Sequence, residues 1–327
     1  MPNIYVTRKI PQGALDLLKE KLGEFEINPD DRVLTREELL EKVKGRDAVL
    51  CLLTDKIDGE VLDAAGKNCK IFSNYAVGFN NIDLKAAGER GVMITNTPGV
   101  LDDATADMAI TLMFAMARRV VESDTMMRQE KFTGWGPMLL LGQDITGKTL
   151  GIVGAGRIGE NVAKKMAHGF GMKILYTDLK GNETLEKETG AKKVDMETLC
   201  RESDFISVHV NYYPETHHLI NEKNLSWMKK TAILVNTSRG PVVDEVALVE
   251  ALKAERIFGA GLDVFEDEPK MKPGLKDLHN IILAPHVGSA TTGTRTNMGL
   301  IAVQNIVDVL SGKEPQYLVN KEFLNAR

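Results

Sequence analysis

The chain has 327 residues, of which 43% are hydrophobic and 27% charged, and its formal net charge is −5 at pH 7. A chain of this length exceeds what one hydrophobic core usually serves, so we expect two globular domains. The lysines and arginines form no run dense enough to neutralise a phosphate backbone, which argues against nucleic acid as a partner.

The cysteines, Cys51, Cys69 and Cys200, are odd in number, and their spacing suits neither a disulfide framework nor a zinc knuckle. We therefore expect no metal and a reducing, cytoplasmic location. The chain enters a strand-like run at once, without the basic start and cleavage site of a signal peptide, and no apolar stretch approaches transmembrane length. The sequence predicts a protein that is neither exported nor embedded in a membrane.

Short β-rich runs alternate with amphipathic, helix-like segments, a pattern typical of parallel βαβ units. The predicted strands are Asn3–Val6, Ala48–Leu53, Lys70–Ser73, Val92–Ile94, Thr149–Val153, Lys173–Tyr176, Phe205–Val208, Ala232–Val235 and Ile281–Leu283. We place a hinge at Asn96–Gly99, because Pro98 disfavours helix at the residue before it. A long helix over Asp103–Met127 and a loop over Phe132–Gly147 should follow, before a second βα series begins at Lys148.

A glycine-rich motif follows one predicted strand and opens a helix: Gly154-Ala155-Gly156-Arg157-Ile158-Gly159. Gly154 permits a tight turn, Gly156 lets a pyrophosphate approach the backbone, and Gly159 lets helix and strand pack closely. Asp178 stands about 20 residues further on, at the end of the next strand, as in dinucleotide-binding units. Its carboxylate can accept the ribose hydroxyls and repels a 2′-phosphate, so the motif predicts NAD rather than NADP. A packing turn without a ligand is the alternative.

Three later segments place polar side chains at strand ends, where parallel sheets bind their ligands. They are Val235–Gly240 with Arg239, Gly259–Pro269 with Glu268, and Leu283–Ser289 with His286. An arginine can grip a carboxylate, a histidine can protonate a developing alkoxide, and a carboxylate can keep that histidine charged. Singly, each is better explained as a surface or core residue. Their combination on a dinucleotide-binding fold predicts hydride transfer to a 2-oxo acid.

The motifs GAGRIG, NTSRG, GLDVFEDEP and PHVGS occur in this order and together resemble the D-isomer-specific 2-hydroxyacid dehydrogenase family over nearly the whole chain. The resemblance implies that Arg239 binds the substrate carboxylate and that His286 is the acid/base, oriented by Glu268. It implies further that the amides of Val77 and Gly78 bind the same carboxylate.

Coenzyme contacts are also implied by the resemblance, with Asp263 near the nicotinamide carboxamide and Thr237 alongside. His209, His217, His218 and His279 lie outside these motifs, and we expect them to be structural or solvated.

Within the family, the chain is most similar to the glyoxylate/hydroxypyruvate reductase branch, through Asn74–Gly78, Asn96–Leu101, Ala104–Asp107 and Gly134–Pro137. In this branch Leu53 would line the substrate pocket, Trp135 would reach the neighbouring subunit's cleft, and the long helix after the hinge would help to form a homodimer. Three positions depart from the branch: Asp102 replaces a usual threonine, Asn211 a usual proline and Asn80 a frequent aspartate. Because of the first two departures, the resemblance does not predict the affinity for the coenzyme.

The predicted fold class is α/β, with two doubly wound, Rossmann-like parallel-sheet domains and a cleft between them. Residues 1–98 and 289–327 would form the substrate domain, and residues 99–288 the NAD-binding domain. The expected activity is NAD(H)-dependent interconversion of a small 2-oxo acid, glyoxylate or hydroxypyruvate, and its 2-hydroxy acid. A lactate- or phosphoglycerate-type dehydrogenase is the nearest alternative. A non-catalytic, NAD(H)-sensing corepressor is a more distant one, against which the joint presence of Arg239, Glu268 and His286 argues.

Overall fold

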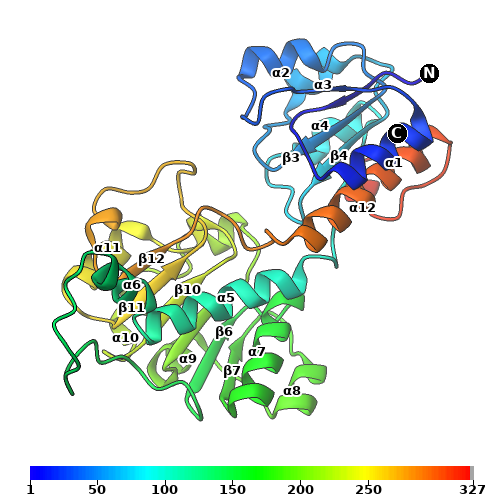
Figure 1. The fold of residues 1–327 in the computed structure, drawn as a ribbon. Helices are drawn as coiled ribbons and strands as arrows, with labels where there is room; N and C mark the ends of the chain where they lie inside the picture. The colour runs from blue at the N-terminus through cyan, green and yellow to red at the C-terminus, as the bar shows by residue number, and fades with distance from the viewer. Residues whose placement is uncertain (325–327) are drawn as a thin grey trace. The chain divides into compact units, whose positions relative to one another are not determined.

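The computed structural model describes residues 1–324, which form two compact units. The first comprises Met1–Leu101 and the chain from Ala290 onward, and the second comprises Asp102–Ser289. Each contains one parallel sheet with helices packed on it (Figure 1), so the predicted pair of parallel-sheet α/β domains is confirmed. The expected boundaries at residues 98 and 288 fall near these divisions, and residues 325–327 of the expected substrate domain lie outside the described residues.

The first unit is built on a sheet of strand order β2-β1-β3-β4-β5, with every neighbouring pair parallel. The strands are β1 (Ile4–Val6), β2 (Glu26–Ile27), β3 (Ala48–Leu52), β4 (Ile71–Tyr75) and β5 (Met93–Thr95). The helices are α1 (Gln12–Leu22), α2 (Arg36–Lys42), α3 (Gly59–Ala65), α4 (Leu84–Glu89), α12 (Thr292–Leu310) and α13 (Lys321–Leu324).

Helices cover both faces of this first sheet. On one face α2, α3 and α4 share a core with the sheet through side chains such as Leu39, Val61 and Phe72. On the other face α12 packs on β4, and the Ser73 hydroxyl donates to the Ala302 carbonyl at 2.9 Å. The C-terminal segment is therefore part of the first unit's core.

The second unit contains a seven-stranded sheet of order β12-β11-β10-β9-β6-β7-β8, again parallel throughout. The strands are β6 (Thr149–Val153), β7 (Lys173–Thr177), β8 (Lys192–Lys193), β9 (Phe205–Val208), β10 (Ile233–Asn236), β11 (Gly259–Leu262) and β12 (Ile281–Leu283). The helices are α5 (Asp102–Ala117), α6 (Val120–Arg128), α7 (Arg157–Phe170), α8 (Glu183–Thr189), α9 (Met196–Glu202), α10 (Glu222–Trp227) and α11 (Glu245–Lys253).

Side chains of the second sheet alternate between two cores, as the period of two in a strand requires. In β10, Ile233 and Val235 join the core formed with α5 and α7, whereas Leu234 joins the core formed with α9, α10 and α11. Both faces are thus buried, which explains why these strands read as continuous apolar runs in the sequence.

The single helix predicted over Asp103–Met127 is wrong. The structure has two helices, α5 and α6, separated at Arg119, whose φ of 51° lies in the left-handed region. The Ala117 carbonyl accepts the N–H of Gln143 at 2.8 Å. A distant loop thus takes the place of the next helical turn. Strands β2, β8 and β11 are additional to the predicted strands.

Among residues 1–324, no helix combines the length and the apolar character that crossing a membrane requires.

Candidate active site

The loops after β10, β11 and β12 all begin at the carboxyl ends of their strands. These ends lie side by side, because the three strands are parallel neighbours. Arg239 follows β10, Glu268 follows β11 and His286 follows β12. The topology therefore brings side chains together that are up to 47 positions apart in the sequence.

His286 and Glu268 are in direct contact. The Nδ1 atom of His286 lies 2.9 Å from Glu268 Oε2, and Glu268 Oε1 accepts the Phe265 N–H at 3.0 Å. Burial raises the pKa of Glu268, but the hydrogen bond and charge of His286, the Phe265 amide and the Arg239 charge outweigh it and hold the pKa below its usual value. Glu268 is therefore ionised at neutral pH and stabilises a proton on His286.

The backbone of His286 adopts a left-handed conformation, with φ of 55°. A histidine rarely adopts it, and here it is held by a hydrogen bond from the His286 N–H to the Asp263 carbonyl at 2.8 Å. The Asp263 carboxylate accepts the N–H groups of Val287 and Gly288 at 2.8 and 2.7 Å. Burial raises the pKa of Asp263, against the effect of these two amides. Asp263 thus fixes the loop that presents His286.

Arg239 is half-buried at the start of a short 3₁₀ turn, Gly240–Val242. Its guanidinium donates to the Ser238 carbonyl at 2.6 Å, and Asn236 Nδ2 donates to the Arg239 carbonyl at 2.9 Å. Burial lowers the pKa of Arg239, and the charge of Glu268 acts in the opposite direction. The remaining N–H groups of the guanidinium suit it to bind a carboxylate.

The glycine-rich loop has the conformation that its motif requires. Gly154 has φ of +94°, and a Cβ there would lie 2.9 Å from the Val210 nitrogen. A Cβ on Gly159 would lie 2.1 Å from the Gly154 carbonyl oxygen, whereas one on Gly156 would meet nothing within 4 Å. Gly154 and Gly159 thus serve packing, and Gly156 leaves open space at the N-terminus of α7, where Arg157 and Ile158 begin the helix. Such space suits a pyrophosphate.

Asp178 follows β7 beside this loop. Its Oδ2 accepts the Ala155 N–H at 2.8 Å, and its Oδ1 accepts the Lys180 N–H at 3.3 Å. An open pocket of about 490 Å³ adjoins it. The lining residues are Ala155, Gly156, Asp178, Lys180, Gly181, Asn182, Glu183 and Thr184.

Two further polar groups lie at the same end of the second unit. The hydroxyl of Thr237 is buried and has no hydrogen-bond partner among residues 1–324. Asp102, at the first residue of α5, pairs with Arg157 at 3.2 Å through its Oδ2. Burial raises the pKa of Asp102, which the Arg157 charge opposes. The departure from threonine at position 102 thus provides a partner for a coenzyme-loop arginine.

In the first unit, Val77 and Gly78 follow β4 in a loop held by buried asparagines. Asn96 Nδ2 donates to the Val77 carbonyl at 2.8 Å, and Asn74 Nδ2 donates to the Gly78 carbonyl at 2.9 Å. The C=O and N–H of a peptide unit point in opposite directions, so Asn96 also fixes the direction of the Gly78 N–H. Leu53, after β3, is 37% exposed.

Trp135 is 85% exposed on the loop that joins α6 to β6. It belongs to a set of exposed apolar side chains on α6 and this loop: Val120, Val121, Met127, Phe132, Trp135, Met138, Leu139 and Leu141. We call this set the apolar arm. None of the α6 residues is buried within the unit.

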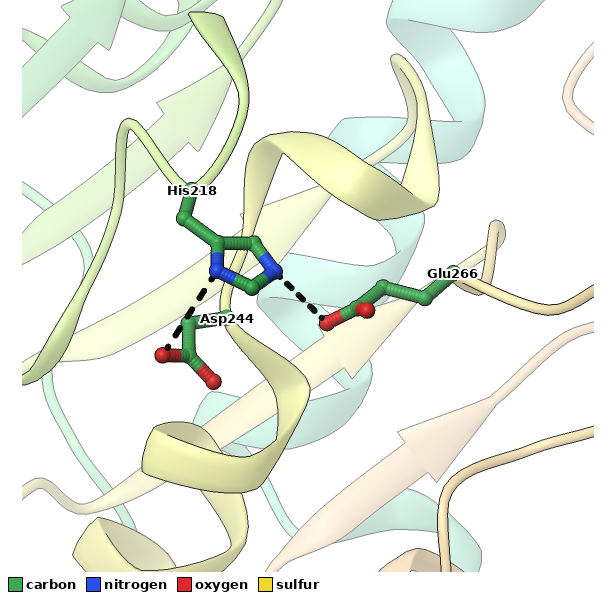
Figure 2. A group of neighbouring side chains, drawn as sticks. All are labelled: His218, Asp244 and Glu266. Atoms are coloured by element: carbon green, nitrogen blue, oxygen red, sulfur yellow. Dashed lines mark hydrogen bonds and ion pairs between the residues drawn. The ribbon is translucent and has the colours of Figure 1, made fainter.

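His218, which the motifs leave aside, lies in a charged cluster with Asp244 and Glu266 (Figure 2). Its two ring nitrogens face Glu266 and Asp244. No sequence motif indicated this contact, because the residues come from three different loops. His209, by contrast, has a buried Nδ1, and burial lowers its pKa to about 3, so it is neutral in the folded protein.

A glycine-rich dinucleotide loop in the same unit as a paired glutamate and histidine is typical of a nicotinamide-dependent oxidoreductase. Residues 110–288 match the family described as D-isomer specific 2-hydroxyacid dehydrogenase, NAD binding domain. The chain is 49% identical to a glyoxylate reductase of Thermococcus litoralis, over 99% of this chain and 98% of that protein. The chain belongs to the D-isomer-specific 2-hydroxyacid dehydrogenase family.

Solved structures agree with this assignment. A protein from Thermus thermophilus has a TM-score of 0.90 at 43% identity, covering 97% of this chain and 99% of its own. An NADPH-dependent glyoxylate/hydroxypyruvate reductase from Sinorhizobium meliloti, in complex with NADP and malonate, has a TM-score of 0.83 at 32% identity, covering 97% and 96%. Structural relatives of this chain thus include an NADPH-dependent enzyme.

Proposed function

We propose that this protein is an NADH-dependent reductase of glyoxylate and other small 2-oxo acids, hydroxypyruvate among them. The observation that carries the proposal is the 2.9 Å contact between His286 Nδ1 and Glu268 Oε2 in a unit that also holds the dinucleotide loop. The extent of identity to the Thermococcus protein supports glyoxylate as substrate.

The roles follow from the geometry of the side chains. The nicotinamide coenzyme, when bound, supplies the hydride. Arg239 binds the substrate carboxylate through its free N–H groups and draws electron density from the adjacent carbonyl. His286 keeps Nδ1 directed at Glu268, so Nε2 delivers the proton to the forming alkoxide. In oxidation, neutral His286 takes the proton back at the same atom.

Substrate binding also involves the first unit in this proposal. The Val77 and Gly78 amides bind the carboxylate, and Leu53 limits the size of the substrate side chain. The support is the resemblance of this loop to that of the family, together with the fixed direction of the Gly78 N–H. Residues 1–98 and 289–327 then serve as the substrate domain, and residues 99–288 as the coenzyme domain.

NADH is the proposed coenzyme because Asp178 places a carboxylate beside the pocket next to Gly156. A 2′-phosphate there would meet its negative charge. Gly156 and the first helical residues of α7 would hold the pyrophosphate, and Thr237 and Asp263 would lie at the nicotinamide end of the coenzyme.

A homodimer is the proposed assembly. The apolar arm exposes large side chains at a density that a monomer seldom leaves in water. Trp135, which is 85% exposed, reaches the substrate pocket of the second copy in this proposal. A reducing, cytoplasmic location agrees with three buried free cysteines.

The test is the oxidation of NADH with glyoxylate, hydroxypyruvate, pyruvate and a bulkier 2-oxo acid, each repeated with NADPH. The expected result is turnover with glyoxylate and hydroxypyruvate, and a preference for NADH. Absence of turnover with every 2-oxo acid would overturn the proposal.

A further inference from the structure

The turn that carries Glu268 is held by charged side chains that take no direct part in proton transfer. Glu266 stands two residues before Glu268, and its side chain is 10% exposed. Its Oε1 accepts the Glu245 N–H at 3.0 Å, and the Glu266 N–H donates in return to Glu245 Oε1 at 2.8 Å. This reciprocal pair ties the turn after β11 to the first turn of α11.

His218 adds a second hydrogen bond to the Glu266 carboxylate. Its Nε2 donates to Glu266 Oε1 at 3.1 Å, and its Nδ1 lies 3.8 Å from Asp244 Oδ2, as Figure 2 shows. Lys272 Nζ lies 3.2 Å from the other oxygen of Glu266. The Lys272 ammonium offsets the charge of Glu266, and His218 donates a hydrogen bond to it, so that Glu266 can lie beside buried Glu245. We call His218, Glu245 and Glu266 the brace.

A metal site is a poorer explanation of this cluster. A single cation would need one nitrogen of His218 and both carboxylates directed at a common point. Here the two ring nitrogens face different carboxylates, and the ammonium of Lys272 already contacts Glu266. The cluster is therefore a hydrogen-bonded connection between loops.

The turn also lies directly against the turn that carries Arg239. A Cβ on Gly240 would lie 1.9 Å from the Phe265 carbonyl carbon and 2.3 Å from the Glu266 nitrogen. The backbones are thus in contact without side chains between them. Any displacement of Phe265 and Glu266 would be transmitted to Arg239 as well as to Glu268.

We infer that the brace positions Glu268 against His286, with Glu266 as the positioning residue. Glu268 Oε1 accepts a hydrogen bond from the N–H of Phe265, the residue next to Glu266. The Glu268 carboxylate therefore moves with this backbone. A shift of about 1 Å would take the Glu268–His286 contact beyond hydrogen-bonding range. Misplacement of this size lowers rates by about 100-fold. The inference rests on the proposed function only where it assigns proton transfer to His286.

The first test is an NMR titration of isotope-labelled His286 in wild type, Glu266→Ala and Asp267→Ala. Asp267 is the matched control, because it also pairs with Lys272, at 2.7 Å, yet its side chain is 58% exposed. Both variants remove one negative charge from the same region. The expected result is a midpoint lowered by about one pH unit in Glu266→Ala, as in Glu268→Gln, and a much smaller change in Asp267→Ala. Equal midpoints in the two variants would overturn the inference.

The second test uses His218→Phe, which keeps an aromatic ring stacked on His217 but removes both ring nitrogens. Loss of an imidazole, whether neutral or positively charged, cannot through charge alone make His286 release its proton more easily. A weakened brace does so by moving Glu268 away. A lowered His286 midpoint supports positioning, whereas a raised or unchanged midpoint in a folded variant contradicts it. If Glu266→Ala does not fold, His218→Phe still tests whether the brace positions Glu268.

Kinetics separate positioning from general destabilisation. For Glu266→Ala we expect kcat for glyoxylate reduction to fall by about 10- to 100-fold with little change in the KM for NADH. A lower melting temperature with wild-type kcat and an unchanged titration would make Glu266 merely structural. If wild type itself reduces no 2-oxo acid, the proposed function fails, while the titration still decides whether the brace sets the Glu268–His286 contact.

Discussion

The carboxylate of Asp263 holds the amide of Gly288 at 2.7 Å, and thereby anchors the loop after β12 to the end of β11. The fit is close, since a Cβ on Gly288 would lie 3.0 Å from Asp263 Oδ2. The left-handed backbone of His286 lies between these two residues in the hydrogen-bonded loop. Asp263 therefore fixes the backbone of His286, the proposed proton donor.

We expect Asp263→Asn to disturb this loop. The amide nitrogen of Asn would face one of the two N–H groups that the carboxylate accepts, and an unpaired buried donor costs about 1–3 kcal/mol. Urea unfolding should show a loss of stability of that order, and kcat should fall by about 10-fold or more. Wild-type kcat and stability would show that the carboxylate does not hold the loop.

Coenzyme choice is predicted to depend on Asp178. Asp178→Ala should weaken the use of NADH and relieve the repulsion of a 2′-phosphate. The ratio of kcat/KM for NADH to that for NADPH should fall by about 10- to 100-fold, or roughly 1.4 kcal/mol for each power of ten. Glu183→Ala, which removes another carboxylate from the same pocket, is the control and should change the ratio less. An unchanged ratio in Asp178→Ala would refute the assignment.

Arg239→Lys tests the grip on the substrate carboxylate. Lysine keeps the charge but loses the planar fork, so KM for glyoxylate should rise and kcat should fall together, by about 100-fold in kcat/KM. Arg201→Lys, at an exposed ion pair on α9, provides the control for the same exchange. Wild-type kinetics in Arg239→Lys would remove this residue from the site.

The dimer is tested on the apolar arm. Val121→Glu, at a side chain that is 50% exposed on α6, should convert the protein to a monomer in sedimentation experiments. Val33→Glu, at a comparably exposed valine in the first unit, should leave the dimer intact. Trp135→Ala should alter the ranking of 2-oxo acids and spare NADH affinity. A wild-type protein that sediments as a fully active monomer would contradict the assembly.

The fold was predictable where local signals agree with burial. Continuous apolar runs predicted β6 and β9, because each strand is buried on both faces. Such a run can be read from the local sequence without knowledge of a distant contact. The break at Arg119 carries no glycine or proline and depends on Gln143 approaching Ala117, which no local pattern encodes. Strand β8, two exposed lysines, carries no apolar signal at all.

The contacts of the candidate site also divide into those that local motifs predict and those that depend on distant segments. Glu268 and His286 could be paired through motifs, and the structure places them in contact. The contact of His218 with Glu266 could not, because it joins residues 48 positions apart through loops of ordinary composition. The motifs associate Asp263 with the coenzyme, whereas its hydrogen bonds to Val287 and Gly288 depend on the spacing of two loops in three dimensions.

The central claim is that ionised Glu268 keeps His286, the proposed proton donor, protonated. The pH profile of glyoxylate reduction tests this claim most directly. The pKa of Glu268 lies below its usual value, so the residue carries its charge throughout the neutral range. Glu268→Gln keeps a hydrogen-bonding side chain but removes that charge, which disfavours the imidazolium. Reduction needs protonated His286, so the alkaline fall in kcat/KM, measured at saturating NADH, should move to lower pH in the variant. Oxidation needs neutral His286 and should stay active to lower pH than in wild type. Superimposable profiles for wild type and Glu268→Gln would contradict the account.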